Sequence, residues 1–301
     1  GLINLDDINL IINDMNYDSM RDVIYAAIPG SDKNGNSIAV INAKTHEAKF
    51  IKISKSPIKL SRYGSYLWIA CSNGSIQKMN ISTLVIEENF QVYLPGDTST
   101  YYVDDLEAIP GHENKIAVSL KRTGVSPRFK AVAIYEFGKI LPNYVTGHSG
   151  SNTIEYANGS LWGYNNETSG YELYQYDIDN NGIEIDESYK NIIQGYNLEL
   201  YEYDDILYTT YGHVVETDAI PSMKSLIDGD FSQNLVIDPW GKNIIFINDD
   251  EDGLLVYNLE NYSFKEEIKL DKKYYSFEKI LCTGINRYVI TTKGGEVIFY
   301  N

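Results

Sequence analysis

The chain has 301 residues, of which 43% are hydrophobic, and this is enough apolar surface for a large core in one or two domains. The formal net charge of -17 argues against binding to nucleic acid or to an anionic membrane through a general electrostatic field. No apolar run reaches the ~18–20 residues needed to span a bilayer, so membrane insertion is not expected.

The chain is built from a repeated pattern. Residues 10–53 hold four short runs rich in β-branched and aromatic residues, with polar turns between them. Such a segment is typical of a four-stranded antiparallel meander. Similar segments follow, and their central hydrophobic runs recur about every 44 residues, close to the roughly 40–45 residues of a β-propeller blade. One residue marks each central run: Tyr25, Trp68, Val118, Trp162, Tyr208, Phe246 and Val289.

The other strands of each repeat flank the marked central strand in chain order. Inner strands are predicted at Leu10–Asn13, Pro57–Ser61, Asp105–Ile109, Thr153–Tyr156, Leu198–Tyr201, Leu235–Asp238 and Phe277–Cys282. Third strands are predicted at Ser37–Asn42, Ser75–Asn80, Ala131–Phe137, Glu172–Ile178, His213–Glu216, Leu254–Leu259 and Glu296–Tyr300. Outer strands are predicted at Ala48–Ile53, Val85–Val92, Lys139–Val145, Ile183–Glu187, Met223–Ile227 and Phe264–Leu270.

These strands predict an all-β fold, a seven-bladed β-propeller of four-stranded antiparallel blades that forms a single domain over residues 1–301. Two β-sandwiches are the alternative, but the even period along the whole chain favours the propeller. The seventh repeat has no predicted outer strand, because the sequence ends at Asn301. Leu2–Leu5 has the missing length, and we expect it to close the ring by pairing there, since an exposed sheet edge would otherwise remain.

The segment Asp104–Glu172 contains a dense block of motifs. It reads DDLEAIPGHENKIAVSLKRTGVSPRFKAVAIYEFGK, then GHSGSNTIEY, then LWGYNNET. This block resembles a group of bacterial secreted or cell-surface propeller proteins related to the YVTN type, which carry GVSPR, a GHTGSN-like stretch and YGYNNET in the same order. The resemblance implies a seven-bladed propeller on an exported, often multidomain protein, extracellular, at the cell surface or periplasmic, with no settled activity. The YVTN tetrapeptide is replaced here by IYAAI, LWIAC and LYTTY, and the WD40 tryptophans and Gly-His pairs are missing in register.

In a propeller, the loops between second and third strands and the links between blades emerge on one face, where ligands commonly bind. The long loops of this chain belong to consecutive repeats, at Pro95–Asp104, Lys121–Lys130, Thr146–Asn152 and Asn165–Tyr171. We therefore expect a ligand site formed by Tyr101, Tyr102, Asp104, Arg122, Arg128, His148, Asn152, Asn165, Asn166 and Glu167. Aromatic rings beside amide and charged groups suit a carbohydrate or a polar peptide. In the alternative interpretation, Arg128 pairs with an acidic neighbour, and Asn152, Asn165 and Asn166 cap turns.

Three inner-strand carboxylates support a different hypothesis. Asp105, Glu107 and Glu155 could provide a general acid and base, with His148 on the adjacent rim, as in a lyase or a glycoside hydrolase. Carboxylates in such positions are more often solvated or hydrogen-bonded to the neighbouring blade.

No metal or cofactor is predicted. Residues 177–182, DIDNNG, match the opening of an EF-hand loop, but Ser188 stands where a bidentate Glu is needed, so a hairpin turn is favoured. The acidic stretch Asn248–Asp252 is interpreted as a turn between strands. The histidines, His46, His112, His148 and His213, have no metal-ligand spacing. Cys71 and Cys282 lie in apolar runs and are expected to be buried free thiols.

The sequence thus favours a non-catalytic recognition module of an exported or cell-surface bacterial protein, as a monomer or as part of a multidomain chain. Its expected ligand is an extracellular glycan, peptide or protein held by the loop face. An enzyme with a site on the same face and a structural spacer are the alternatives.

Overall fold

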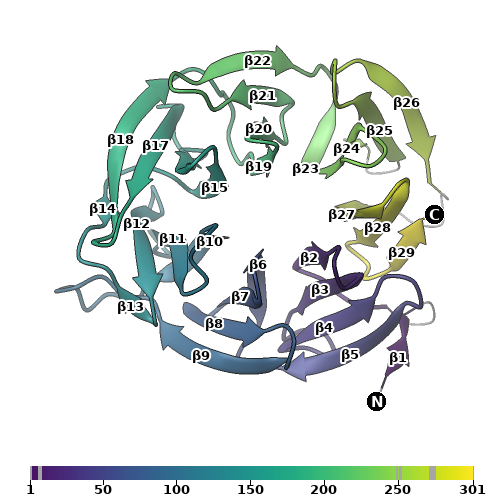
Figure 1. The fold of residues 1–301 in the computed structure, drawn as a ribbon, viewed down its shortest axis with the longest axis horizontal. Helices are drawn as coiled ribbons and strands as arrows, with labels where there is room; N and C mark the ends of the chain where they lie inside the picture. Colours follow the sequence, from purple (N-terminus) through teal and green to yellow (C-terminus); the bar gives the residue numbers. More distant parts are fainter. Residues whose placement is uncertain (1, 6–8, 249, 251–252, 271–275, 301) are drawn as a thin grey trace. The chain divides into compact units, whose positions relative to one another are not determined.

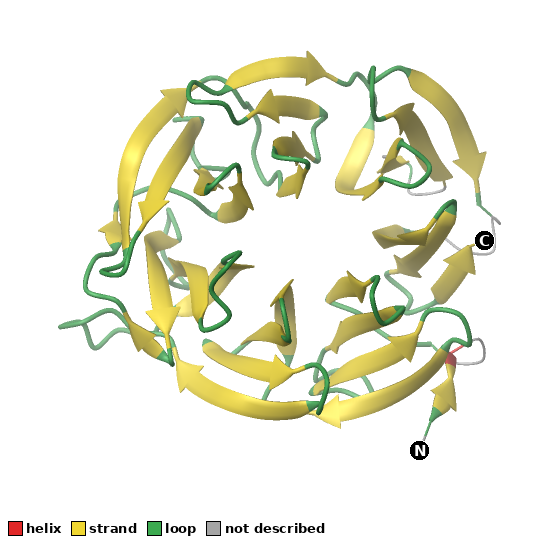
Figure 2. Ribbon diagram, viewed as in Figure 1, coloured by secondary structure: helices red, strands yellow, loops and turns green. Residues whose placement is uncertain are grey.

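The computed structural model describes residues 2–5, 9–248, 250, 253–270 and 276–300. Among these residues the strands form seven antiparallel sheets, and Figure 2 shows how little of the chain adopts any other regular structure. The chain divides into two compact units. The first comprises Gly1–Ile58, Thr210–Gly212 and Ser225–Asn301, and the second comprises Lys59–Thr209 and His213–Lys224.

The second unit holds sheets 2 to 5, apart from the ends of β6 and β22, and hydrogen-bonded neighbours follow one another in chain order (Figure 1). Sheet 2 is formed by β6 (Pro57–Tyr63), β7 (Tyr66–Cys71), β8 (Ser75–Asn80) and β9 (Val85–Gln91). Sheet 3 is formed by β10 (Tyr102–Ala108), β11 (Lys115–Lys121), β12 (Phe129–Glu136), β13 (Lys139–Ile140) and β14 (Val145–Thr146). Sheet 4 is formed by β15 (Thr153–Ala157), β16 (Ser160–Tyr164), β17 (Glu172–Ile178) and β18 (Ile183–Lys190). Sheet 5 is formed by β19 (Leu200–Tyr203), β20 (Ile206–Thr209), β21 (His213–Glu216) and β22 (Ser222–Leu226).

The first unit holds sheets 1, 6 and 7. Sheet 1 is formed by β1 (Ile3–Asn4), β2 (Asp14–Asp18), β3 (Val23–Ile28), β4 (Ser37–Asn42) and β5 (Glu47–Lys52). Sheet 6 is formed by β23 (Phe231–Asp238), β24 (Asn243–Asn248), β25 (Gly253–Asn258) and β26 (Phe264–Lys269). Sheet 7 is formed by β27 (Phe277–Gly284), β28 (Arg287–Thr292) and β29 (Val297–Tyr300).

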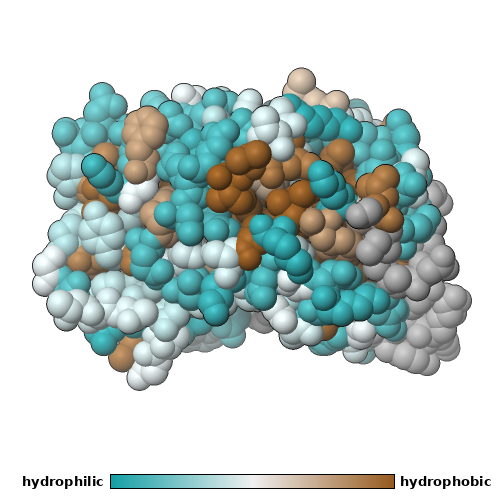
Figure 3. All heavy atoms as spheres, turned by 90° about the horizontal axis from the view of Figure 1, so that it is seen from below, coloured by the Kyte–Doolittle hydropathy of each residue, from teal (hydrophilic) through white to brown (hydrophobic). Residues whose placement is uncertain are grey.

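The second strand of each sheet forms its most apolar part, as the sequence predicted. Every marker residue of the repeat lies on such a strand and is buried, among them Tyr25, Trp68 and Trp162. The outer strands are more exposed: burial alternates along β9, and most residues of β18, β22 and β26 are exposed. The face drawn in Figure 3 is accordingly mostly hydrophilic, with apolar side chains in smaller areas. Cys71 and Cys282 are buried free thiols, which confirms the expectation.

The inner strand of the first repeat is displaced from its predicted position. It is β2 at Asp14–Asp18, whereas Leu10–Asn13 was expected. Leu10 and Ile12 are buried in a core cluster together with Ile24 and Val289, so this apolar run packs between sheets 1 and 7 without joining either ladder. The predicted outer strand Lys139–Val145 is likewise split into β13 and β14, with Pro142, which has no backbone N–H for a ladder, between them.

The predicted pairing of Leu2–Leu5 with the seventh repeat is wrong. β1 pairs with the outer strand of sheet 1, with Ile3 opposite Ala48 and Asn4 opposite Glu47 (Figure 1). Sheet 7 has three strands among the described residues. The Leu10 backbone N–H donates to the Gly295 carbonyl at 2.6 Å, so the N-terminal segment contacts sheet 7 through a loop and not as its outer strand.

Within each unit, hydrogen bonds between a side chain of one sheet and a backbone N–H of the next join neighbouring sheets, whose strands, in the described part of the chain, do not pair with one another. In each case a polar side chain near the inner strand of one sheet accepts a backbone N–H from the inner strand of the next sheet. The pairs are Ser61 with Ala108 at 2.8 Å, Asp105 with Ile154 at 2.9 Å, Thr153 with Leu200 at 3.2 Å, and Asn234 with Ile280 at 3.2 Å. These backbone groups would otherwise be buried without a partner, which is costly.

Replacing Thr153 by valine is expected to lower the free energy of unfolding by about 1–2 kcal/mol, because the buried N–H of Leu200 loses its acceptor. Urea denaturation measures the change. Thr153→Ser keeps the hydroxyl and should lose less stability than the valine variant. A valine variant as stable as the native chain would show that this hydrogen bond does not stabilise the contact between the sheets.

Candidate functional site

Four of the sequence-predicted site residues meet in one hydrogen-bonded cluster of the second unit, together with Lys121. This cluster, called the polar network below, consists of Asp104, Lys121, Arg128, Asn152 and Glu167. Glu167 accepts from the backbone N–H of Arg128 at 2.8 Å and from its Nε at 3.0 Å. The Asn152 amide donates to Asp104 at 3.2 Å and to Glu167 at 3.3 Å, and Lys121 Nζ lies 2.7 Å from Asp104. Two cations and two carboxylates therefore balance in charge.

Register shifts between β10 and β11 and between β11 and β12 position Asp104 and Arg128 of this network. Val103 and Asp105 pair with consecutive residues of β11, so Asp104 is the extra residue of a β-bulge. A second register shift lies where Lys121 pairs with Phe129, next to Arg128. Bulges redirect side chains away from regular alternation and are common beside functional sites.

Asn152 contains a buried polar atom without a partner. Its side chain is 5% exposed, and no hydrogen bond among the described residues uses Oδ1. Reversing the amide would place this oxygen beside the carboxylates of Asp104 and Glu167, so the observed orientation is the one that the network selects. Burying an acceptor without a donor costs roughly 1–3 kcal/mol.

Arg128 is the exposed part of the network. Its side chain is 42% exposed, and its guanidinium hydrogen bonds to the described residues use Nε alone. Burial lowers the pKa of Arg128, but the charges of Asp104 and Glu167 outweigh it and raise that pKa overall. The guanidinium is thus charged and held in place, with its terminal nitrogens available to an acceptor.

Tyr101 and Arg122, two other predicted site residues, both interact with Asp97 and are not part of the polar network. Tyr101 is buried, and its hydroxyl donates to Asp97 at 2.5 Å. Burial and the hydrogen bond to Asp97 raise the pKa of Tyr101 to about 12, while the charge of Arg122 lowers it. Tyr102 is partly exposed on β10, opposite Lys121. The buried ring of Tyr101 therefore offers no flat surface to a ligand.

Asn165 caps the loop after β16, as the alternative interpretation describes, whereas Asn166 contacts a distant part of the chain. Asn165 Oδ1 accepts from the backbone N–H of Thr168 at 3.1 Å, and its amide donates to Glu172 at 2.9 Å. The Asn166 amide donates to the Leu198 carbonyl at 2.8 Å. His148 is exposed, and within the described part of the chain no hydrogen bond joins it to the polar network.

The inner-strand carboxylates form a second cluster in the same unit. Lys59 Nζ lies 3.4 Å from Asp105 and 3.2 Å from Glu199, and the Ser61 hydroxyl donates to Glu107 at 3.0 Å. Desolvation by burial raises the pKa values of Asp105, Glu107 and Glu155. Repulsion from Glu199 adds to the rise for Asp105, although Lys59 opposes it. Repulsion from Asp105 adds to the rise for Glu107, and repulsion from Glu107 and Asp105 adds to it for Glu155. All three pKa values move upward, and the rise is larger for Glu107, to about 8, than for Asp105, to about 6.

The structure gives no support for a metal ion in the described residues, among which no group of His, Cys, Asp and Glu is arranged to hold one. In the EF-hand-like segment, Asp179 accepts from the backbone N–H groups of Asn181 at 2.7 Å and Gly182 at 3.0 Å. It caps the hairpin between β17 and β18, as the turn interpretation predicted. Of the stretch Asn248–Asp252, residues 249, 251 and 252 lie outside the described residues.

Sequence reasoning missed Lys121 and Lys59 as partners of these carboxylates. Lys59 is a cation within a predicted inner strand, and this unusual placement was the available signal. Lys121 was named only as the start of a loop, and its pairing with Asp104 depends on the bulge in β10.

No protein-family model matches the sequence, and the search of curated proteins gave no significant match. Among solved structures, the chain is similar to the β-propeller domain of Cps50 (Swd1) from Myceliophteria thermophila, with a TM-score of 0.74, 11% identity and coverage of 100% of this chain and 98% of that one. It is also similar to hydrazine synthase from Kuenenia stuttgartiensis, with a TM-score of 0.72, 10% identity and coverage of 99% and 96%.

Identities this low establish the fold alone. No helix within the described residues is long and apolar enough to cross a membrane. The seven sheets and these similarities together confirm the predicted fold: the chain is an all-β, seven-bladed β-propeller built on four-stranded antiparallel blades.

Proposed function

We propose that the chain is a non-catalytic recognition module that binds an extended polypeptide segment at the polar network. The observation that carries this proposal is the buried, unpartnered Oδ1 of Asn152 in the same hydrogen-bonded network as the half-exposed guanidinium of Arg128, to which Glu167 links it. An unpaired acceptor and an available donor lie in one charge-balanced cluster. They match the alternating N–H and C=O groups of a peptide backbone.

The same residues favour a peptide over a carbohydrate. A sugar ring presents an apolar face that an exposed aromatic ring can cover, but Tyr101 is buried and bonded to Asp97. Tyr102 is partly exposed and can contact an apolar side chain of the peptide. The balanced charges of the network favour a ligand group without net charge.

The proposal includes an exported or cell-surface location in a bacterium, as the resemblance to YVTN-type propellers implies. The propeller fold is compatible with an interaction module, although one fold hosts many functions. The choice of a peptide as the ligand therefore rests on the residues of the polar network and not on the fold.

Binding to a library of peptides displayed on a surface tests the proposal. Native protein should select a set of peptides, and both Arg128→Ala and Asn152→Ala should weaken their binding at least about tenfold, which corresponds to the loss of about one hydrogen bond. Lys139→Ala removes an exposed cation of the same sheet outside the network and should leave binding unchanged. Selected peptides that bind all variants equally would contradict the proposed site, and selection of glycans in place of peptides would contradict the ligand class.

An enzyme of the lyase or glycoside hydrolase type is the second candidate, favoured by one observation. Burial raises the pKa values of Glu107 and Glu155, so either could hold a proton as a general acid near neutral pH. Turnover of a polysaccharide that Glu155→Gln abolishes, without a change in thermal stability, would establish this function in place of recognition.

A further inference from the structure

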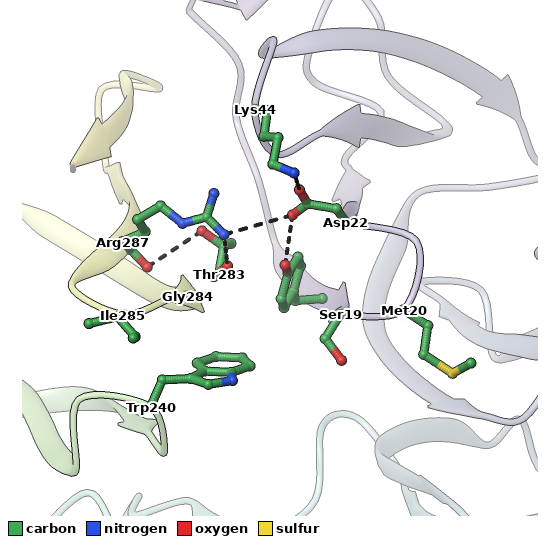
Figure 4. Close-up of a pocket in the computed structure, with 10 residues that line it drawn as sticks. Ser19, Met20, Asp22, Lys44, Trp240, Thr283, Gly284, Ile285 and Arg287 are labelled. Atoms are coloured by element: carbon green, nitrogen blue, oxygen red, sulfur yellow. Dashed lines mark hydrogen bonds and ion pairs between the residues drawn. The ribbon is translucent and has the colours of Figure 1, made fainter.

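A pocket of the first unit, separate in sequence from the polar network, has the features of a ligand site. Its volume is about 580 Å³, and its lining residues come from turns of three sheets. Asp22 and Met20 lie between β2 and β3, Lys44 between β4 and β5, Trp240 between β23 and β24, and Ile285 between β27 and β28. Figure 4 shows a polar side and an apolar side of this pocket.

The polar side carries an excess of positive charge. Asp22 lies 3.1 Å from Lys44 Nζ and 4.0 Å from Arg287 Nη2, and it accepts from the Tyr17 hydroxyl at 2.7 Å. Although burial opposes it, the hydrogen bonds of Tyr17 and Lys44 lower the pKa of Asp22, so one carboxylate faces two cations. A net positive group in a chain with a formal net charge of -17 is the expected complement of an anion.

The β27–β28 turn holds Arg287 in place. Its Nη2 donates to the Thr283 carbonyl at 2.6 Å. The guanidinium also packs so closely on Gly284 that a Cβ at this position would lie 2.6 Å from Nε. Among the described residues no hydrogen bond uses Nε or Nη1, and a pre-positioned guanidinium of this kind suits a carboxylate.

The apolar side consists of large side chains that water now contacts. Trp240 is 46% exposed and Ile285 is 62% exposed. Met20, 92% exposed, lies apart from them, beyond Ser19 (Figure 4). Figure 4 shows the Trp240 indole beneath Ile285, on the side of the pocket away from Lys44. Covering an exposed aromatic ring and its apolar neighbours is favourable by about 25 cal/mol per Å².

We propose that this pocket binds a carboxylate attached to an aromatic body, with the carboxylate on Arg287 and Lys44 and the ring on Trp240. Such a group occurs in free aromatic acids and in the C-terminal residue of a peptide that ends in Phe, Tyr or Trp. The inference does not depend on the peptide proposed for the polar network, because it uses different residues in the other unit.

Fluorescence titration and calorimetry with 3-phenylpropionate test the inference. Trp240 is the exposed member of the three tryptophans, since Trp68 and Trp162 are buried, so its emission should report binding. We expect saturable binding that 3-phenylpropionamide, which lacks the charge, matches only at concentrations at least tenfold higher. Added salt should weaken binding of the acid and not of the amide. Equal affinity for acid and amide, or no binding of any carboxylate tested, would overturn the inference.

Variants and a second probe assign the contacts. Arg287→Gln and Trp240→Ala should each weaken binding at least tenfold, whereas Arg21→Gln, an arginine of the same unit outside the pocket lining, should not. Asp22→Asn removes a carboxylate that competes with the ligand for Arg287 and Lys44, so it should strengthen binding several-fold, which a purely structural role would not produce. Asparagine also tolerates the φ of 54° at this position.

The peptide Ala-Ala-Phe, with a free or an amidated C-terminus, distinguishes a free aromatic acid from a peptide terminus as the natural ligand. Binding of the free form and not of 3-phenylpropionate would assign the site to a peptide terminus. Unchanged affinity in Arg287→Gln would refute the proposed carboxylate contact.

Discussion

Replacing Lys78 by methionine is expected to lower the free energy of unfolding by about 3 kcal/mol, because it leaves the half-buried carboxylate of Glu88 without its cation. The Lys78 side chain on β8 is 2% exposed, with Nζ 3.2 Å from Glu88 Oε1 and 2.6 Å from Asn114 Oδ1. Its ammonium also lies 3.9 Å from the ring centroid of Tyr66 and 5.1 Å from that of Trp68. Glu88 Oε2 has no partner among the described residues, so Glu88 depends on this lysine.

Urea denaturation of a double variant separates the ion pair from packing. Lys78→Met with Glu88→Leu replaces both charges by apolar groups of similar size and should recover at least half of the loss. Lys139→Met, an exposed change, is the control and should alter stability by less than about 0.5 kcal/mol. A double variant no more stable than Lys78→Met would mean that Lys78 stabilises sheet 2 through Asn114 and the aromatic rings, and not through Glu88.

Glu107→Gln is expected to stabilise the chain by about 1–2 kcal/mol at pH 8 and to leave its stability unchanged near pH 4. Burial, despite the hydrogen bond from Ser61, raises the pKa of Glu107, and repulsion from Asp105 adds to the rise. A carboxyl whose pKa is raised in the folded state stabilises the fold fully below the unfolded pKa, near 4.5. That contribution is lost as the pH rises through the higher pKa of the folded state. Glutamine keeps an oxygen that can accept from the Ser61 hydroxyl, 3.0 Å away in the native chain, and carries no charge.

Thermal unfolding followed from pH 4 to pH 9 measures this effect. The chain also gains negative charge as the pH rises, which destabilises a protein of net charge -17 in any variant. Glu184→Gln, at an exposed position of β18, is therefore the matched control, and the effect is the difference between the two variants. If both variants gave the same dependence on pH, Glu107 would titrate as a solvated carboxylate, and Glu155 alone would remain as the candidate general acid of the enzyme hypothesis.

The periodic apolar runs were sufficient to predict the strands that form the centre of each sheet. Tyr25, Trp68 and Trp162 each lie on a second strand because a buried β-strand needs a run of apolar residues that is visible locally. The first inner strand was misplaced for the opposite reason. Asp14–Asp18 is a polar run, and only the burial of Leu10 and Ile12 against neighbouring sheets forces the chain to pair there.

For the candidate site, the sequence indicated which loops contribute residues but not which side chains contact one another. Four residues of the long loops and the strands beside them, Asp104, Arg128, Asn152 and Glu167, lie together in one hydrogen-bonded cluster. Which of the predicted residues face one another depends on the bulge at Asp104 and on the burial of Tyr101. Both follow from register and packing, which are not local properties of the sequence.

The sequence by itself determined the number of repeats, the strands at their centres and the residue types in the long loops. Only the tertiary structure decided that the N-terminal strand joins sheet 1, that Asn152 carries an unpaired oxygen, and that turns from three sheets enclose a positively charged pocket. The physical reason is that hydrophobic periodicity is a property of neighbouring residues, whereas edge pairing, polar contacts and pockets join residues tens to hundreds of positions apart.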